Sequence, residues 1–167
     1  MISLVLRFGE PAVSLGLFLW GSSIMPSVFD VARYILDKVT PITSWKLQKL
    51  VFYSQAWATV WDDQEIFPEQ FEAWGNGPVC CELYHKHKGC FHLLPEQIDG
   101  VPDCLSQDHK DTIDEVINVY GDKSGMWLTN QTQSERPWLD ARGDTASGEP
   151  STEVITLDSM AAYYGSF

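Results

Sequence analysis

Apolar residues recur with helical spacing from the first part of the chain that shows a regular pattern. A first helix is predicted between Ser27, which can cap it, and Pro41, which ends it. Asp30 lies in its first turn, where a carboxylate favours the helix dipole. A second helix begins at Thr43 or Ser44 and continues to Trp61. Because that helix is apolar around much of its circumference, we expect it at the centre of the domain.

The spacing changes after the second helix. Apolar and polar residues alternate over residues 65–67 and 71–74, which predicts two short strands. The sequence Gly75-Asn-Gly-Pro78 is a turn signal, and proline also suits the first turn of a helix. We therefore expect a third helix from Pro78 to about Lys88 that ends at Gly89.

The rest of the chain predicts short helices joined by loops. Ser106 caps a helix that Gly121 closes, and residues 124–132 form another. A turn or helix starts at residues 134–138, and a short helix ends the chain over residues 155–164. The predicted fold class is mainly α with a small β-hairpin element (α+β), in a compact single helical domain.

Charge narrows the choice of partners. The chain has 167 residues, which fits one domain, and its 23 Asp and Glu against 11 Lys and Arg give a net charge of −12. Such a surface repels phosphate backbones, so nucleic acid is a poor partner. Basic proteins suit it better, because opposite charges steer association. Seven Trp, six Tyr and eight Phe can serve either the core or an interface.

Cysteines and histidines gather in one segment but predict no metal site. The order Cys80-Cys81-x3-His85-x-His87-x2-Cys90-x-His92 offers ligand types that zinc accepts, but its spacing departs from the usual structural patterns. The fourth cysteine, Cys104, stands apart from them. We expect reduced thiols in a cytoplasmic protein that has neither a metal nor a cofactor.

Residues 1–24 differ from the remainder, and we divide the chain into 1–24 and a domain over 25–167. The apolar stretch from Ala12 to Trp20 is too short to span a bilayer, so no membrane segment is predicted. A misplaced start codon is the favoured interpretation, because Trp20-Gly21 requires a run of G bases just before Met25, where a bacterial ribosome-binding site would lie. A signal peptide or a docking tail are the alternatives.

Sequence motifs for catalysis are missing. The chain has no G-x-S-x-G, P-loop or G-x-G-x-x-G sequence, so we predict no enzyme and no catalytic residue. The less favoured alternative is that Glu72 and Glu135 act as a pair of catalytic acids. Lys46 and Lys49 form a small basic spot that could hold either glutamate or bind an anion or a partner. The candidates for a shared polar or binding cluster are Lys46, Gln48, Lys49, Tyr53, Glu72, Thr132 and Glu135.

Three segments carry motifs in a fixed order: 41–57 (with Lys46-Leu-Gln-Lys-Leu-x2-Tyr53-x-Gln55), 71–84 (with Trp74-x2-Gly77-Pro-Val) and 124–142 (with Thr132-x2-Glu135-x-Pro137-Trp138). Together they resemble the signatures of one family, the SocA-like antitoxins with a Panacea domain, among them the phage-associated GepA proteins. Departures are Gln133, where the family often has histidine, and Cys81, where it often has proline. Motif residues expected to build the fold are Trp74, Gly77, Pro78, Tyr84, Pro137 and Trp138.

The resemblance implies a role in a bacterial or prophage toxin–antitoxin pair, in which the domain neutralises a cognate protein toxin by direct binding. An adaptor that delivers a toxin to a cytosolic protease is an alternative that it also implies. A small enzyme that uses a metal or its carboxylates is the remaining alternative.

Overall fold

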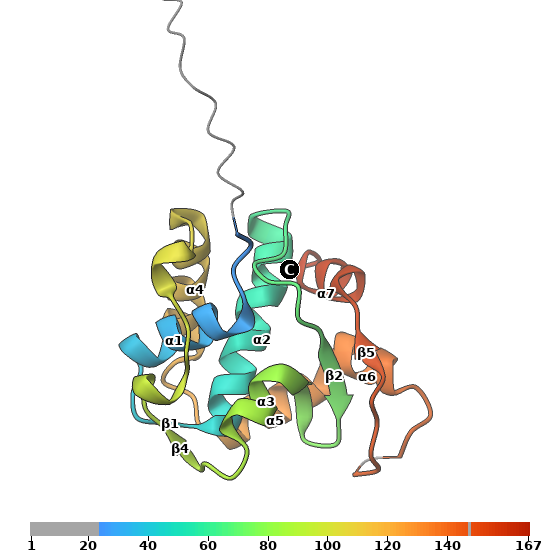
Figure 1. Cartoon of the computed structure of the whole chain (residues 1–167). Coiled ribbons are helices and arrows are strands. Elements are labelled where there is room, and N and C mark those ends of the chain that lie inside the picture. The colour runs from blue at the N-terminus through green and yellow to red at the C-terminus, as the bar shows by residue number, and fades with distance from the viewer. Residues whose placement is uncertain (1–23, 147) are drawn as a thin grey trace, which may run out of the picture.

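The computed structural model describes residues 24–146 and 148–167 (Figure 1). The expectation for residues 1–24 therefore lies outside the described residues, apart from Ile24. Seven α-helices and a few short strands make up the described part, and the prediction of a mainly helical α+β fold is confirmed. None of the helices described combines the length and the apolar character needed to cross a membrane.

Helix α2 (Ser44–Trp61) lies at the centre, as its apolar circumference predicts (Figure 1). Its first turn is capped by the Thr43 hydroxyl, which accepts the Lys46 N–H at 3.2 Å. Twelve of its eighteen residues are buried. The helices around it are α1 (Val28–Lys38), α4 (Gln107–Tyr120), α5 (Gly125–Ser134) and α7 (Leu157–Tyr164).

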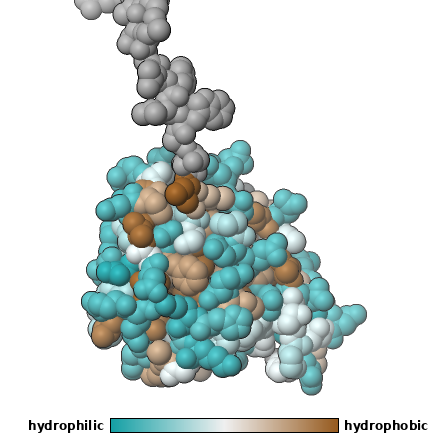
Figure 2. Space-filling model, viewed as in Figure 1, coloured by the Kyte–Doolittle hydropathy of each residue, from teal (hydrophilic) through white to brown (hydrophobic). Residues whose placement is uncertain are grey.

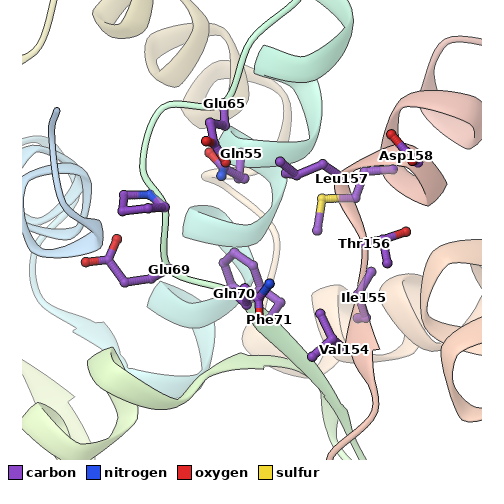
Figure 3. A pocket seen from close by; sticks show the side chains of 12 residues that line it. Gln55, Glu65, Glu69, Gln70, Phe71, Val154, Ile155, Thr156, Leu157 and Asp158 are labelled. Atoms are coloured by element: carbon purple, nitrogen blue, oxygen red, sulfur yellow. The ribbon is translucent and has the colours of Figure 1, made fainter.

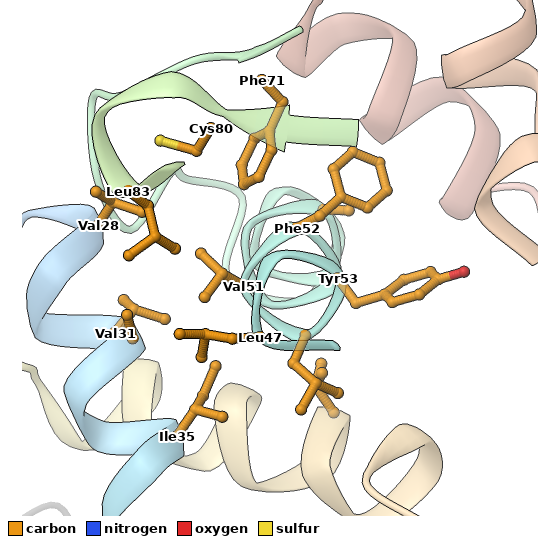
Figure 4. Packing of buried hydrophobic residues seen from close by; sticks show 14 of the residues in the cluster. Val28, Val31, Ile35, Leu47, Val51, Phe52, Tyr53, Phe71, Cys80 and Leu83 are labelled. Atoms are coloured by element: carbon orange, nitrogen blue, oxygen red, sulfur yellow. The ribbon is translucent and has the colours of Figure 1, made fainter. Parts of the chain in front are cut away.

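The core forms where α2 meets α1 and the sheet. Figure 4 shows Leu47, Val51 and Phe52 of α2 between residues of α1 on one side and Phe71 on the other. All of these side chains are at most 1% exposed. Burial of each such side chain contributes roughly 1.5–3 kcal/mol to the stability of the domain.

The Asp30 carboxylate fixes the start of α1. It accepts the Ser27 N–H at 2.7 Å, and its other oxygen accepts the Val101 N–H at 2.6 Å. Burial opposes ionisation of Asp30, but these hydrogen bonds outweigh it and hold the pKa of Asp30 below its ordinary value. The Asp30 side chain, which forms a capping box with the N-cap residue Ser27, therefore also ties α1 to the distant loop at Val101.

Three antiparallel strands form a small sheet in the order β3-β2-β5: β2 (Phe71–Trp74), β3 (Gly77–Cys80) and β5 (Val154–Ile155). A turn at Gly75 and Asn76 joins β2 to β3, as predicted. A separate pair, β1 (Ile42–Thr43) and β4 (His92–Leu93), lies at the N-terminal end of α2.

Two predicted boundaries in this region are wrong. Residues 65–67 are not a strand, because the Gln55 side chain accepts the Ile66 N–H at 2.9 Å and donates to the Phe67 carbonyl at 2.7 Å. Residues 78–80 are not helical, because they pair with β2. Helix α3 (Cys81–His87) starts only after that strand.

The remaining elements are short. The loop predicted around Pro95 and Pro102 contains the 3-10 turns η1 (Pro95–Gln97) and η2 (Pro102–Cys104). Helix α6 (Arg136–Arg142) follows α5 directly, with Pro137 in its first turn. Figure 2 shows one face of the molecule, on which polar residues cover most of the surface and apolar residues form separate spots.

Candidate protein-binding surface

Gln48 and Lys49 of α2 bind the free edge of strand β3. The Gln48 amide accepts the Cys80 N–H at 2.9 Å and donates to the Cys80 carbonyl at 3.2 Å. Its nitrogen also lies 3.0 Å from His87 Nε2. Lys49 donates from Nζ to the Pro78 carbonyl at 2.9 Å. These two side chains replace the neighbouring strand that β3 lacks on that side.

Lys49 is fully buried, and burial lowers the pKa of its ammonium to about 7. It contacts the turn before β3 closely, since a Cβ on Gly77 would lie 2.9 Å from Lys49 Cε and 2.9 Å from Thr132 Oγ1. Gly77 also has a φ of +94°, which favours glycine. The structure therefore brings Lys49 and Thr132 together across Gly77.

Glu135 gathers three donors in the interior. Tyr53 donates its hydroxyl to the Glu135 carboxylate at 3.1 Å, Tyr164 does so at 2.5 Å, and Gln131 donates at 3.0 Å. Burial raises the pKa of Glu135, although these donors favour its ionised form. Because Glu135 ends α5 and precedes α6, this cluster fixes the junction of two helices to α2 and α7.

Of the remaining cluster candidates, Lys46 and Glu72 lie apart from these two clusters. Lys46 donates to the Gly121 carbonyl at 2.6 Å, and Thr132 donates to the Leu128 carbonyl of its own helix at 3.0 Å. Glu72 accepts the Trp74 indole N–H at 2.7 Å. Among residues 24–146 and 148–167, neither Lys46 nor Lys49 forms an ion pair with Glu72 or Glu135. The candidates thus occupy several sites instead of a shared one.

The motif residues around the sheet make packing contacts. The Trp138 indole donates to the Trp74 carbonyl at 2.9 Å, and the Trp74 and Tyr84 rings meet edge to face at 4.9 Å. Arg142, which we did not predict as a site residue, donates to the Ala73 carbonyl at 2.9 Å. Gln133 donates its side-chain N–H to the Gly75 carbonyl at 2.7 Å. This hydrogen bond is a structural contact, which glutamine can make because its amide carries a donor.

The side chains of the cysteine- and histidine-rich segment do not come together at one site. The described part of the chain contains no group of three or more His, Cys, Asp or Glu side chains placed to hold a metal ion. Cys80 is buried, and burial raises the pKa of its thiol to about 12, which disfavours the nucleophilic thiolate.

A pocket of about 230 Å³ lies between the segment before β2 and the start of α7 (Figure 3). Its carboxylates do not face one another: Glu65, Glu69 and Asp158 lie on separate sides in Figure 3. Glu69 accepts the Val28 N–H at 3.1 Å. The pocket lining includes no His, Cys or Lys.

Exposed apolar side chains gather instead at the N-terminal end of α2. Two adjoining pockets of about 360 and 270 Å³ share Trp45 and Phe91 as walls, and we call them together the Trp45–Phe91 groove. Met126 and Thr129 of α5 line one side, and Tyr84 and Lys88 line the other. Phe91 is 68% exposed and Met126 is 70% exposed. Apolar groups this open are typical of protein interaction sites.

Backbone hydrogen bonds hold the walls of this groove in position. Strands β1 and β4 pair in the register Ile42 with Leu93, and the Phe91 carbonyl accepts the Ser44 N–H at 3.0 Å. Phe91 is thereby held beside the first turn of α2. Gly125 lets the start of α5 approach the same turn, since a Cβ there would lie 3.3 Å from Thr43 Oγ1. No local sequence pattern marks this groove, because its walls come from segments that are far apart along the chain.

The fold and its surfaces define a small, mainly helical domain in which buried motif residues anchor the backbone and an apolar groove remains open. The family model described as "Antitoxin SocA-like, Panacea domain" matches residues 47–139, more than half of the chain. The chain belongs to this family of SocA-like antitoxins. Searches among curated proteins and among solved structures found no match.

Proposed function

We propose that this protein is an antitoxin that neutralises a cognate protein toxin by binding it directly, without catalysis. The membership in the SocA-like family supports the general role. The open Trp45–Phe91 groove carries the proposal of direct binding, because Phe91 and Met126 remain more than two-thirds exposed in the free chain. A partner that covers these side chains would gain roughly 25 cal/mol for each Å² of apolar surface buried.

The groove has the composition of an interface core. Trp45 and Phe91 are aromatic, Met126 is flexible and apolar, and Trp127 next to it is 42% exposed. Tryptophan is among the residues that most often dominate binding energy at interfaces, and methionine adapts to partners of different shape. All four cysteines are free thiols, which supports the proposed location in the cytoplasm.

Co-expression with the toxic protein encoded by the neighbouring gene tests the proposal. We expect the intact chain to restore growth, and the double variant Phe91→Ser/Met126→Ser to lose that protection while its melting temperature stays unchanged. Val101→Ser is the matched control, because Val101 is 62% exposed but lies outside the groove. Failure of the intact chain to protect would reject the antitoxin role. Full protection by the double variant would reject the groove.

A second candidate, the adaptor that delivers a toxin to a cytosolic protease, is favoured by the placement of two tryptophan side chains, of which Trp45 is partly buried and Trp61 is 47% exposed. Trp45 and Trp61 lie near opposite ends of α2, roughly 24 Å apart at the helical rise. That spacing gives room for two partners at once. Co-precipitation with purified protease and toxin tests this candidate, and a complex that contains only the toxin would reject it.

A further inference from the structure

A second open surface lies at the C-terminal end of α2, away from the Trp45–Phe91 groove. It is a shallow groove of about 320 Å³ between that end of α2 and the outer side of α4. We call it the Trp61 groove, and its lining consists of Trp61, Asp62, Asp108, Asp111, Thr112 and Glu115.

Trp61 supplies the apolar part of this groove. Its side chain is 47% exposed, and its ring stacks on the Trp57 ring at 4.7 Å with an angle of 19°. Trp57 also donates its indole N–H to the Tyr120 hydroxyl at 3.4 Å. The exposed indole is therefore a fixed flat surface, because its neighbour is itself anchored. A fixed indole costs little side-chain entropy when a partner covers it.

Charge around Trp61 is of one sign. Four of the six lining residues are carboxylates, and the lining contains no lysine or arginine. None of these four takes part in an ion pair with another described residue. Asp111 and Glu115 are four residues apart on α4, where like charges repel each other. This arrangement leaves repulsion that an approaching cation would relieve.

The spread of the carboxylates selects the kind of cation. The described residues contain no group of three carboxylate, histidine or cysteine side chains placed around one metal position. A single metal ion is therefore a poor match. A peptide segment with several lysine or arginine side chains matches better, because its charges are also spread and its alkyl stems can lie on the indole.

We propose that the Trp61 groove is a docking site for a lysine- or arginine-bearing segment of a partner protein, with the cationic side chains lying on the Trp61 ring and among the α4 carboxylates. This site goes beyond the proposed toxin contact, because it shares no lining residue with the Trp45–Phe91 groove. Electrostatic attraction here also agrees with the net charge of −12, which speeds association with basic partners.

Calorimetric titration of the full chain with a synthetic amphipathic lysine–leucine peptide tests the site, with the matching glutamate–leucine peptide as the reference. We expect the basic peptide to bind, the acidic one not to bind, and the affinity to fall as salt is raised. Asp111→Asn/Glu115→Gln should weaken binding about tenfold, since it removes two of the facing charges. Trp61→Leu should weaken it as well.

The matched control is Glu149→Gln/Glu153→Gln, which removes the same charge from exposed positions in the loop before β5. We expect this control to bind the basic peptide like the unchanged chain. Equal weakening by both double variants would overturn the proposal, because it would mean attraction to net charge alone. Absence of binding at low salt would also overturn it. Neither outcome bears on toxin neutralisation through the other groove, so the two proposals fail separately.

Discussion

The buried Lys49 leads us to predict how the free energy of unfolding depends on pH. Burial lowers the pKa of its ammonium from 10.5 to about 7. At about 1.4 kcal/mol for each tenfold change in acidity, this corresponds to roughly 4–5 kcal/mol against the charged form in the folded state. One hydrogen bond, from Nζ to the Pro78 carbonyl, offsets part of that cost.

The sign of the pH dependence follows from proton binding. Between the folded pKa of about 7 and the unfolded value of 10.5, the unfolded chain binds the proton that folded Lys49 has released. The free energy of unfolding should therefore rise with pH in this window, by roughly 1 kcal/mol per pH unit from this group. Below pH about 7 both states carry the proton, and the contribution of Lys49 becomes independent of pH.

Urea unfolding of the unchanged chain and of Lys49→Met at about pH 7.5 and about pH 8.5 measures this contribution. The variant should lack the Lys49 part of the slope, so the unchanged chain should gain stability relative to the variant as pH rises. Methionine retains the length and the burial of the side chain, and thus separates charge from packing. His87, whose pKa burial lowers, titrates below this window. Identical slopes in both proteins would refute the assigned cost of burial.

Three further predictions concern the backbone, the buried carboxylate and the helix cap. Gly77→Ala should destabilise the fold by about 2 kcal/mol or more, and Gly89→Ala should destabilise it by less. Both glycines have a positive φ, but only Gly77 lies close to Lys49 and Thr132. Thermal melting of the two variants compares the costs. Glu135→Leu should cost about 1–3 kcal/mol in urea unfolding, since it leaves the Tyr53 and Tyr164 hydroxyls without their acceptor, and an unchanged midpoint would contradict the cluster. Asp30→Ala should cost about 1 kcal/mol near neutral pH. That difference should shrink as pH falls through the lowered pKa of Asp30, and a constant difference down to strongly acidic pH would argue against its role.

Helices could be predicted from the sequence because their signals are local. Thr43 and Ser106 cap α2 and α4 in the positions expected, and α5 lies within a residue or two of its predicted range. The failed strand at 65–67 has a tertiary cause, because Gln55, ten residues upstream, satisfies that backbone. A side chain that replaces a strand leaves no mark in the alternation of polar and apolar residues.

The sequence predicts which residues are candidates for a polar cluster, but it does not predict which of them contact one another. Lys46, Lys49 and Tyr53 all lie on α2 and are candidates for the shared polar cluster. The helical rise separates the first from the last by roughly 10 Å, so each contacts a different segment. Phe91 and Met126 could not be recognised as neighbours at all, because the pairing of β1 with β4 and the close approach of α5 at Gly125 bring them together.

The central claim is that the protein neutralises a toxin by binding it directly. Amide hydrogen exchange on the free chain and on its complex with the toxin encoded by the neighbouring gene tests this claim most directly. If the toxin docks in the Trp45–Phe91 groove, protection should increase at residues 88–91 and 125–129, which contain residues of its walls. A stable complex with unchanged exchange in both segments and new protection elsewhere would contradict the account.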